Sequence, residues 1–189
     1  EKSRGRLASL EALQHAALGG EAGTAHEWLE RLGLGRSRRL AEVLEVDVGW
    51  EAAVETVLQG WLDAVLVDSP SAFETELHAL EQVNLTLLSA TSSDTGFPAG
   101  TLAAKARGPV AALNLLARVT TVESIGAAQS AMPMLGDGQS LITPEGEWIG
   151  PGFARIARSQ GAQAGVLSRE REISGLFERI AELESEISA

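Results

Sequence analysis

The stretch ISGLFERIAELESEI, residues 173–187, carries apolar residues at alternating steps of three and four. This spacing is typical of the a and d positions of a coiled coil, and the Glu and Arg residues between them suit its charged exterior. An ordinary amphipathic helix packed on a domain is the other interpretation of such a segment taken alone. The apolar positions of this seam are Ile173, Leu176, Ile180, Leu183 and Ile187.

A second, shorter seam at the other end of the chain favours the coiled coil. Its positions, three, four and three residues apart, are Leu7, Leu10, Gln14 and Ala17. Gly19 and Gly20 follow, as glycines commonly do at a helix C-terminus, so we predict a helix over residues 2–18. Because the two helices lie at opposite ends of the chain, they can pair antiparallel with each other. The chain would then run out along one strand of a coil, form a globule and return along the other strand.

The first half of the intervening sequence alternates strand and helix patterns. Residues 61–67 form an apolar run of buried-strand length, and residues 84–88 form a second short strand. Between them, Ser71 and Glu74 have the spacing of a capping box that begins a helix. A strand, a helix and a strand at this spacing predict a parallel βαβ unit with a right-handed crossover.

The second half follows a run of Ser, Thr, Gly, Asp and Pro at residues 89–100, which is the best linker candidate. Helix patterns follow around residues 110–116 and 125–134, and Pro144 and Gly146 between two apolar runs predict a hairpin. We therefore predict a mixed α/β fold of two pseudo-symmetric α/β halves flanked by antiparallel coiled-coil helices. The predicted segments are 1–20 (coil helix), 21–90 (first half), 91–100 (linker), 101–162 (second half) and 163–189 (coil helix).

Composition limits the classes of function. The 189 residues include no cysteine, which excludes a disulfide framework and thiol chemistry and fits a reducing compartment. No run of eighteen apolar residues and no signal-peptide pattern occurs, so we expect a cytoplasmic chain without membrane contact. The net charge of −11 argues against a nucleic-acid binder over the whole surface, so any DNA contact must be local. The chain begins at Glu1 within a helical pattern, and we expect it to be part of a longer protein.

Motifs for catalysis and for cofactor binding are missing. No phosphate-binding Gly-x-x-x-x-Gly-Lys-Ser/Thr string occurs, and after Gly33 and Gly35 the third glycine of a dinucleotide fingerprint is replaced by Arg38. His26 and Glu27 lack the second histidine of a zinc-protease motif, and with three histidines and no cysteine a zinc site would need mostly carboxylates. No Gly-x-Ser-x-Gly string supports a serine nucleophile. We predict no catalytic residue, no metal site and no cofactor, with His26 and His78 on helix surfaces.

Three features in order resemble one known family. An aromatic-led helix pattern at residues 50–60 precedes a buried-strand pattern at residues 64–67, and residues 141–152 form a string of the type vT-x-x-G-x-x-x-x-P-G. Both ends of the chain run into heptads. This set resembles the hinge domain of bacterial SMC (structural maintenance of chromosomes) proteins, and residues 7–66 look most like the gammaproteobacterial members.

The resemblance implies a mechanical function. A hinge of this family forms a homodimer that joins two long coiled-coil arms, and each arm ends in an ATPase head outside this chain. ATP and Mg²⁺ would belong to those heads, and accessory condensin subunits would bind there too. The implied role is chromosome condensation and segregation in the cytoplasm, in association with the nucleoid.

The resemblance also implies interface residues. Glycines after the hairpin line the family's dimer contacts, where a missing side chain lets two backbones approach. We expect the strand around residues 148–152 of one subunit to meet the first half of the other, by extension across a strand edge. The family's next glycines are replaced here by Phe153 and by the residues of the 155–158 segment, so the carry-over ends at Gly152. The predicted interface residues are Gly146, Trp148, Ile149, Gly150 and Gly152.

Basic residues gather in the two end segments, and SMC hinges are known for DNA contact near the coil junction. We expect that pairing of the end helices brings these residues together as a local DNA patch. Solvated arginines offset by Glu11, Glu170 and Glu172 are the alternative interpretation. The candidate residues are Lys2, Arg4, Arg6, Arg155, Arg158, Arg169 and Arg171; a further cluster, Arg36, Arg38 and Arg39, is left unassigned.

Two other classes of function stay open. The first is a coiled-coil-flanked adaptor that binds a protein partner and has no chromosome role. The second is a small-molecule-binding α/β domain, which would require a large apolar pocket with convergent polar groups.

Overall fold

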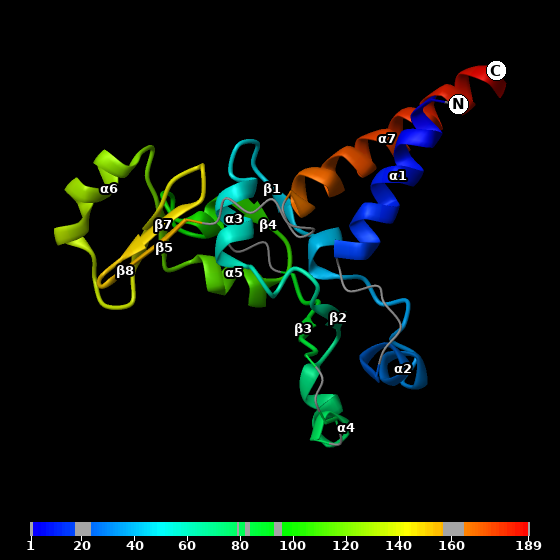
Figure 1. The fold of residues 1–189 in the computed structure, drawn as a ribbon, viewed down its shortest axis with the longest axis horizontal. Helices are drawn as coiled ribbons and strands as arrows, with labels where there is room; N and C mark the ends of the chain where they lie inside the picture. Colours follow the sequence, from blue (N-terminus) through cyan, green and yellow to red (C-terminus); the bar gives the residue numbers. More distant parts are fainter. Residues whose placement is uncertain are drawn as a thin grey trace.

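The computed structural model describes residues 2–17, 24–78, 80–81, 84–92, 96–156 and 165–188. Helices α1 (Lys2–Ala17) and α7 (Val166–Ser188) lie side by side and antiparallel, with the beginning of α1 and the end of α7 at the same, outer end of the coil (Figure 1). Leu7, Leu10 and Ile173 are buried between them, with Leu176 and Ile180 packed alongside. The two predicted seams are confirmed at these positions. Ala17 and Ile187 lie outside the residues whose side chains are described.

The first half contains the predicted parallel pair of strands. β2 and β3 pair in parallel, with Val65 opposite Leu87. β2 is shorter than predicted because residues 61–64 form turns, in which the Ala64 N–H donates to the Trp61 carbonyl oxygen at 2.9 Å. The elements are α2 (Thr24–Arg31), η1 (Leu40–Glu42), β1 (Glu45–Val46), α3 (Glu51–Val57), β2 (Val65–Val67), η2 (Pro70–Phe73), α4 (Glu74–His78) and β3 (Leu87–Ser89).

The predicted capping box at Ser71 is wrong. The helical segment begins two residues earlier, as a 3-10 turn with Ser69 at its N-cap and Pro70 in its first position, where a missing N–H costs nothing. The Ser71 hydroxyl instead lies 2.8 Å from the Ser69 hydroxyl. An early start at a proline therefore displaces the cap that the spacing had suggested.

The second half is built on a four-stranded sheet in the order β5-β6-β7-β8. β5 and β6 are parallel, and the other neighbours are antiparallel. The two predicted helices and the hairpin around residue 146 are confirmed, whereas β5 and β8 were not predicted. The elements are η3 (Leu102–Lys105), β4 (Ala106–Arg107), α5 (Val110–Leu116), β5 (Val119–Thr121), α6 (Ile125–Ala131), η4 (Met132–Met134), β6 (Ser140–Ile142), β7 (Glu147–Gly150) and β8 (Phe153–Ile156).

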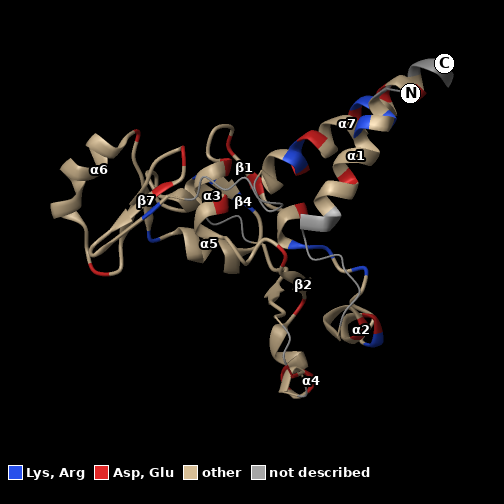
Figure 2. Ribbon diagram, in the orientation of Figure 1, with Lys and Arg blue, Asp and Glu red and all other residues tan. Residues whose placement is uncertain are grey.

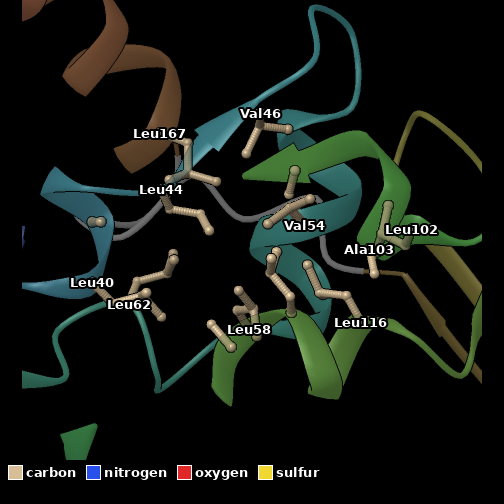
Figure 3. Packing of buried hydrophobic residues seen from close by; sticks show 14 of the residues in the cluster. Leu40, Leu44, Val46, Val54, Leu58, Leu62, Leu102, Ala103, Leu116 and Leu167 are labelled. Atoms are coloured by element: carbon tan, nitrogen blue, oxygen red, sulfur yellow. The ribbon is translucent and has the colours of Figure 1, made fainter. Parts of the chain in front are cut away.

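One hydrophobic core runs through both halves. Leu40, Val54 and Leu58 from the first half pack in one cluster with Leu102 and Leu116 from the second (Figure 3). β1 and β4, one from each half, also pair antiparallel. The halves are thus held together by apolar burial and by a shared strand pair, while their boundaries at residues 91–100 stay a prediction. In the part of the chain that is described, no helix is both long and apolar enough to cross a bilayer.

Candidate functional site

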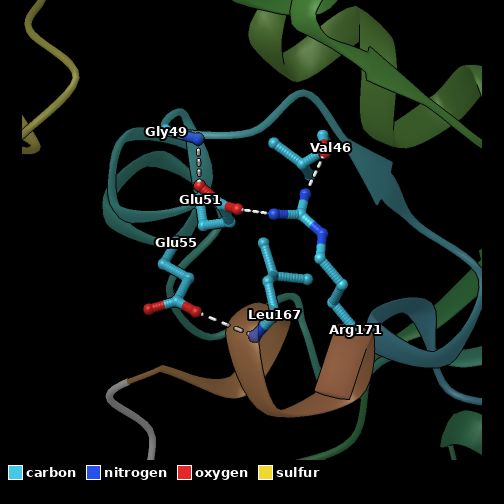
Figure 4. A network of polar contacts seen from close by, with 6 residues as sticks. All are labelled: Val46, Gly49, Glu51, Glu55, Leu167 and Arg171. Atoms are coloured by element: carbon cyan, nitrogen blue, oxygen red, sulfur yellow. Dashed lines mark hydrogen bonds and ion pairs between the residues drawn. The ribbon is translucent and has the colours of Figure 1, made fainter. Parts of the chain in front are cut away.

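The first turn of α7 is capped by a carboxylate from α3. Glu55 accepts hydrogen bonds from the backbone N–H groups of Gly165 at 3.0 Å and Leu167 at 2.8 Å (Figure 4 draws the second). The first N–H groups of a helix have no partner within the helix, so a side-chain acceptor stabilises them, and a negative charge suits the positive end of the helix dipole. Burial raises the pKa of Glu55 above its usual value, although both hydrogen bonds and the charge of Arg169 oppose this shift.

One turn further along α7, Arg171 ties the helix to two elements of the globule. Its guanidinium donates to the Glu51 carboxylate at the start of α3 and to the Val46 carbonyl oxygen of β1 (Figure 4). Glu51 also accepts a 2.7 Å hydrogen bond from the Gly49 N–H. Together with the Glu55 cap, this region, which we call the coil junction, fixes the start of α7 to α3 and β1.

A buried amide joins α1 to the same turn of α7. The Gln14 side chain donates to the Val166 carbonyl oxygen at 3.0 Å and to the Glu170 carboxylate at 3.1 Å. It also accepts a 3.1 Å hydrogen bond from the Arg169 guanidinium. Burial raises the pKa of Glu170, against the effect of the Gln14 hydrogen bond. The predicted seam position is therefore polar because it pairs with polar groups of α7.

At the other end of the globule, β7 and β8 form a tight hairpin. Pro151 and Gly152 lie between the paired residues Gly150 and Phe153, and the φ of +83° at Gly152 is the left-handed conformation that a type II turn places at its second central residue. The Phe153 ring packs edge-on against Trp148, with 5.4 Å between ring centroids, and covers Gly150. Aromatic packing over a glycine therefore stabilises the hairpin.

β8 ends the four-stranded sheet. β7 is its one neighbour, and among the described residues no strand pairs with its outer side, which we call the β8 edge. All four residues are exposed; Phe153 retains 43% and Ile156 retains 58% of its accessible surface. β3 is likewise the last strand of its two-stranded sheet, since the other side of β2 is bonded to residues 38–40. Unpaired strand edges are places where another chain can add a strand.

The family model described as "SMC proteins Flexible Hinge Domain" matches residues 35–132, which is more than half of the chain. The chain belongs to the SMC hinge family. This confirms the family inferred from the hairpin string and from the heptads at both ends.

Curated relatives match most of the length of the chain. The Chromosome partition protein Smc of Xanthomonas oryzae pv. oryzae is 41% identical over 163 residues, which cover 86% of this chain and 14% of that protein. The protein of the same name from Coxiella burnetii is 41% identical over 172 residues, covering 89% of this chain and 15% of that protein. The hinge thus spans about one seventh of the length of these relatives, and the predicted likeness to gammaproteobacterial members is confirmed.

A solved hinge shares the fold. The chain in the "asymmetric dimer of the Geobacillus stearothermophilus SMC hinge domain" superimposes with a TM-score of 0.60 at 20% identity, over 99% of this chain and 93% of that one. The predicted α/β fold with flanking helices is confirmed.

The predicted interface residues lie together in and beside β7, but the predicted strand contact needs a correction. β7 is paired with β6 on one side and with β8 on the other, so Trp148 and Ile149 have no free backbone edge. β8 was not predicted, so the prediction left β7 as the last strand. Among the described residues the outer side of this sheet is the β8 edge, while Trp148 and Ile149 stay predicted interface residues.

Three of the predicted interface glycines have reasons within the chain. Gly146 is buried against α3: an added Cβ would lie 2.7 Å from the Thr56 hydroxyl oxygen and 3.0 Å from the Ala52 carbonyl oxygen. Gly150 leaves room for the Phe153 ring, which occupies the place of a family glycine. At Gly152 the surroundings are open and the reason is its positive φ.

The basic residues do not form the single patch that was predicted. α1 runs from the outer end of the coil toward the globule, so Lys2 and Arg4 lie at its outer end, not at the junction, and Arg6 lies further in, within reach of Glu172. Arg4 pairs with Glu184, and Arg6 pairs with Glu172 at 2.9 Å; the pKa of Glu172 is lowered by this arginine. Arg155 lies on β8 and donates to Gln59. Arg169 and Arg171 do lie at the junction, and Arg158 falls outside the described residues.

The arginines that were left unassigned lie beside the coil junction, where the seven residues of the predicted DNA patch were expected. Arg36, Arg38 and Arg39 line a cavity of about 500 Å³ against the coil, together with Gln14 and Glu170. Figure 2 shows basic residues on the segment that leads from α2 to η1. Arg36 and Arg38 are exposed, and the Arg38 guanidinium donates to the Glu42 carbonyl oxygen. Glu11 and Glu42 also line this cavity, so its charge is mixed.

Groups suited to metal binding are not gathered in the described parts of the chain. No set of three His, Asp or Glu side chains converges there. His26 and His78 are exposed on α2 and α4, as predicted. The predicted absence of a cofactor stays a prediction.

Proposed function

We propose that the chain is the homodimerisation hinge of a bacterial SMC protein. The observation that carries this proposal is the β8 edge, with its unpaired backbone and two large, half-exposed apolar side chains. The dimer of the Geobacillus stearothermophilus SMC hinge domain, which has a similar fold, supports it. We propose no catalytic role and no cofactor for this chain.

The dimer that we propose is two-fold symmetric. The β8 edge of one subunit pairs with β3 in the first half of the partner, and the same contact forms a second time about the two-fold axis. Residues 21–90 and 101–162 act as the two halves in this arrangement. Trp148, Ile149 and Gly152 lie beside the contact and complete it. In each subunit, residues 1–20 and 163–189 pair as one coil, which begins the arm of that subunit.

The larger protein that we propose for this hinge is a condensin-type ATPase. Its heads, outside this chain, bind ATP and Mg²⁺, and accessory subunits act there. It works on the chromosome, in condensation and segregation, in the cytoplasm and at the nucleoid. The shared names of the relatives, Chromosome partition protein Smc, support this assignment.

The test of dimerisation is the molar mass of the chain in solution over a concentration series. We expect about twice 19.8 kDa, persisting on dilution. Ile156→Lys on the β8 edge should shift the mass toward the monomer because a charge then lies at the contact. Val48→Lys is the matched control, since Val48 is 84% exposed in the turn between β1 and α3. A dimer unaffected by Ile156→Lys would contradict the β8 contact, and a monomeric parent chain would favour the adaptor function.

A second proposal is local DNA contact at the coil junction. The exposed Arg36 and Arg38 beside the cavity support it, and Arg169 and Arg171 lie on the nearby turn of α7. Phosphate contacts make affinity depend on salt, so Arg36→Ala should weaken binding of duplex DNA and lower the slope of log K against log salt by about one. Arg179→Ala, on the outer part of α7, is the control. Equal slopes for the two variants would contradict this site.

A further inference from the structure

Helix α3 carries two rows of contacts that lead to different ends of the molecule. Glu51 and Glu55 form one row, and Ala52 and Thr56 form the other, each with a spacing of four residues. Residues four apart lie above one another on a helix, and a step of one residue turns the row by about 100°. The two rows are therefore adjacent faces of one short, rigid helix.

The first row holds the coil. Glu55 caps the start of α7 through the Gly165 and Leu167 N–H groups, and Glu51 pairs with Arg171 (Figure 4). A displacement of α3 would pull both carboxylates away from groups that have fixed positions on α7.

The second row holds the β6–β7 turn. Thr56 donates to the Ala52 carbonyl oxygen at 2.8 Å, and this pair lies directly against Gly146, too close for a side chain there. In the turn just after α3, Gln59 accepts a hydrogen bond from Arg155 of β8. Ala53 and Val54, on the remaining side of α3, are fully buried in the shared core.

We propose that α3 couples the β7–β8 hairpin to the coil, with Glu55 as the positioning residue. A shift of the hairpin moves α3, and α3 moves the start of α7. Only the part of this inference that concerns the affinity of the dimer rests on the proposed function. If β8 forms the dimer contact, the direction of the coil and the dimer Kd depend on each other, because a coupling free energy acts equally in both directions.

The first experiment measures the coil direction in the monomer. The chain has no cysteine, so spin labels can be placed at Met134→Cys in the second half and Ala181→Cys on α7, both exposed, in the Ile156→Lys background. Double electron–electron resonance gives the distance distribution between them. We expect Gly146→Ala to shift or broaden it, because the new Cβ pushes on α3. Gly152→Ala, with the same φ but open surroundings, should leave it unchanged. Identical distributions for the two folded variants would overturn the coupling.

The second experiment measures the dimer Kd by sedimentation without labels. Glu55→Ala, far from β8 in sequence, should raise the Kd at least about fivefold, the lower end of typical couplings between sites. Glu51→Gln should raise it in the same direction, and Glu182→Ala on outer α7 should not. An unchanged Kd in both junction variants would overturn the coupling. A parent chain that never dimerises would overturn the proposed function instead, and the distance experiment would then decide the coupling alone.

Discussion

The coil junction and the β8 edge satisfy their polar groups in opposite ways. At the junction, the N–H groups that begin α7, the guanidinium of Arg171 and the amide of Gln14 all have partners in the same chain. At the β8 edge, the outer backbone groups have no strand partner among the described residues, and Ile156 stays more than half exposed.

The difference separates two kinds of surface in one small molecule. A buried polar group that loses its partner costs free energy, so separation of α7 from α3 and β1 at the junction is unfavourable. An exposed edge costs little in the single chain and gains by adding a strand. Substitutions at the junction should therefore change the stability of the chain, and substitutions at the edge should change its association.

Gly146→Ala should have the largest effect on stability. The positive φ of +84° costs an alanine roughly 1–2 kcal/mol, and crowding against Thr56 and Ala52 adds roughly 1–3 kcal/mol. Gly152→Ala has nearly the same φ, +83°, and no crowding, so it isolates the conformational part. Urea unfolding of both variants measures the difference. Equal losses would show that α3 yields to the new side chain.

Glu55→Ala should follow, with a loss of about 1–2 kcal/mol, as is typical when a helix cap is removed. The amides of Gly165 and Leu167 then lose their acceptor, and α7 should fray from its beginning. Hydrogen exchange at these two amides locates the effect. Glu178→Ala, exposed on α7, is the control. Fraying in the control as well would place the weakness in α7 itself.

The pH dependence of stability should be smaller in Glu55→Gln. Burial raises the pKa of Glu55 in the folded chain, so the folded state binds this proton more tightly than the unfolded state. Its contribution to stability is therefore full below about pH 4.5 and is lost as the pH rises through the folded pKa. Glutamine does not titrate, so unfolding curves between pH 4.5 and 7 should show a smaller decline. A decline as steep as in the parent chain would assign the effect to Glu170, whose pKa is also raised.

Ile156→Lys should have the smallest effect on the stability of the single chain, within about 0.5 kcal/mol, because the side chain is already 58% exposed. Urea unfolding at a concentration where the parent is monomeric measures it. A loss as large as that of Glu55→Ala would mean that the edge belongs to the core of the chain.

The features that could be predicted from the sequence are those that repeat with a regular spacing. The seams at Leu7, Leu10 and Ile173 repeat with the period of a coil, and the helix at residues 110–116 was found with its observed bounds. A resemblance of ordered strings was enough to find the family.

Contacts between distant residues were not predictable. Glu55 and Leu167 lie 112 residues apart and share no periodic pattern, so the junction had no signal in the sequence. β8 was missed because Phe153, Ala154, Arg155 and Ile156 show no apolar alternation, although Pro151 and Gly152 would have marked its turn. The predicted basic patch was wrong because of the direction of α1. This helix begins at the outer end of the coil, far from the globule, which follows from the antiparallel coil that was itself predicted.

The buried amide of Gln14 has a consequence for the alignment of the two coil helices. Apolar seams tolerate a slip, since after a shift of one heptad, roughly 10 Å, leucines again meet isoleucines. Gln14 does not, because its partners, the Val166 carbonyl and the Glu170 carboxylate, occur at one level only. The hydrogen bonds of this one amide therefore set the register of the two helices at the base of the coil.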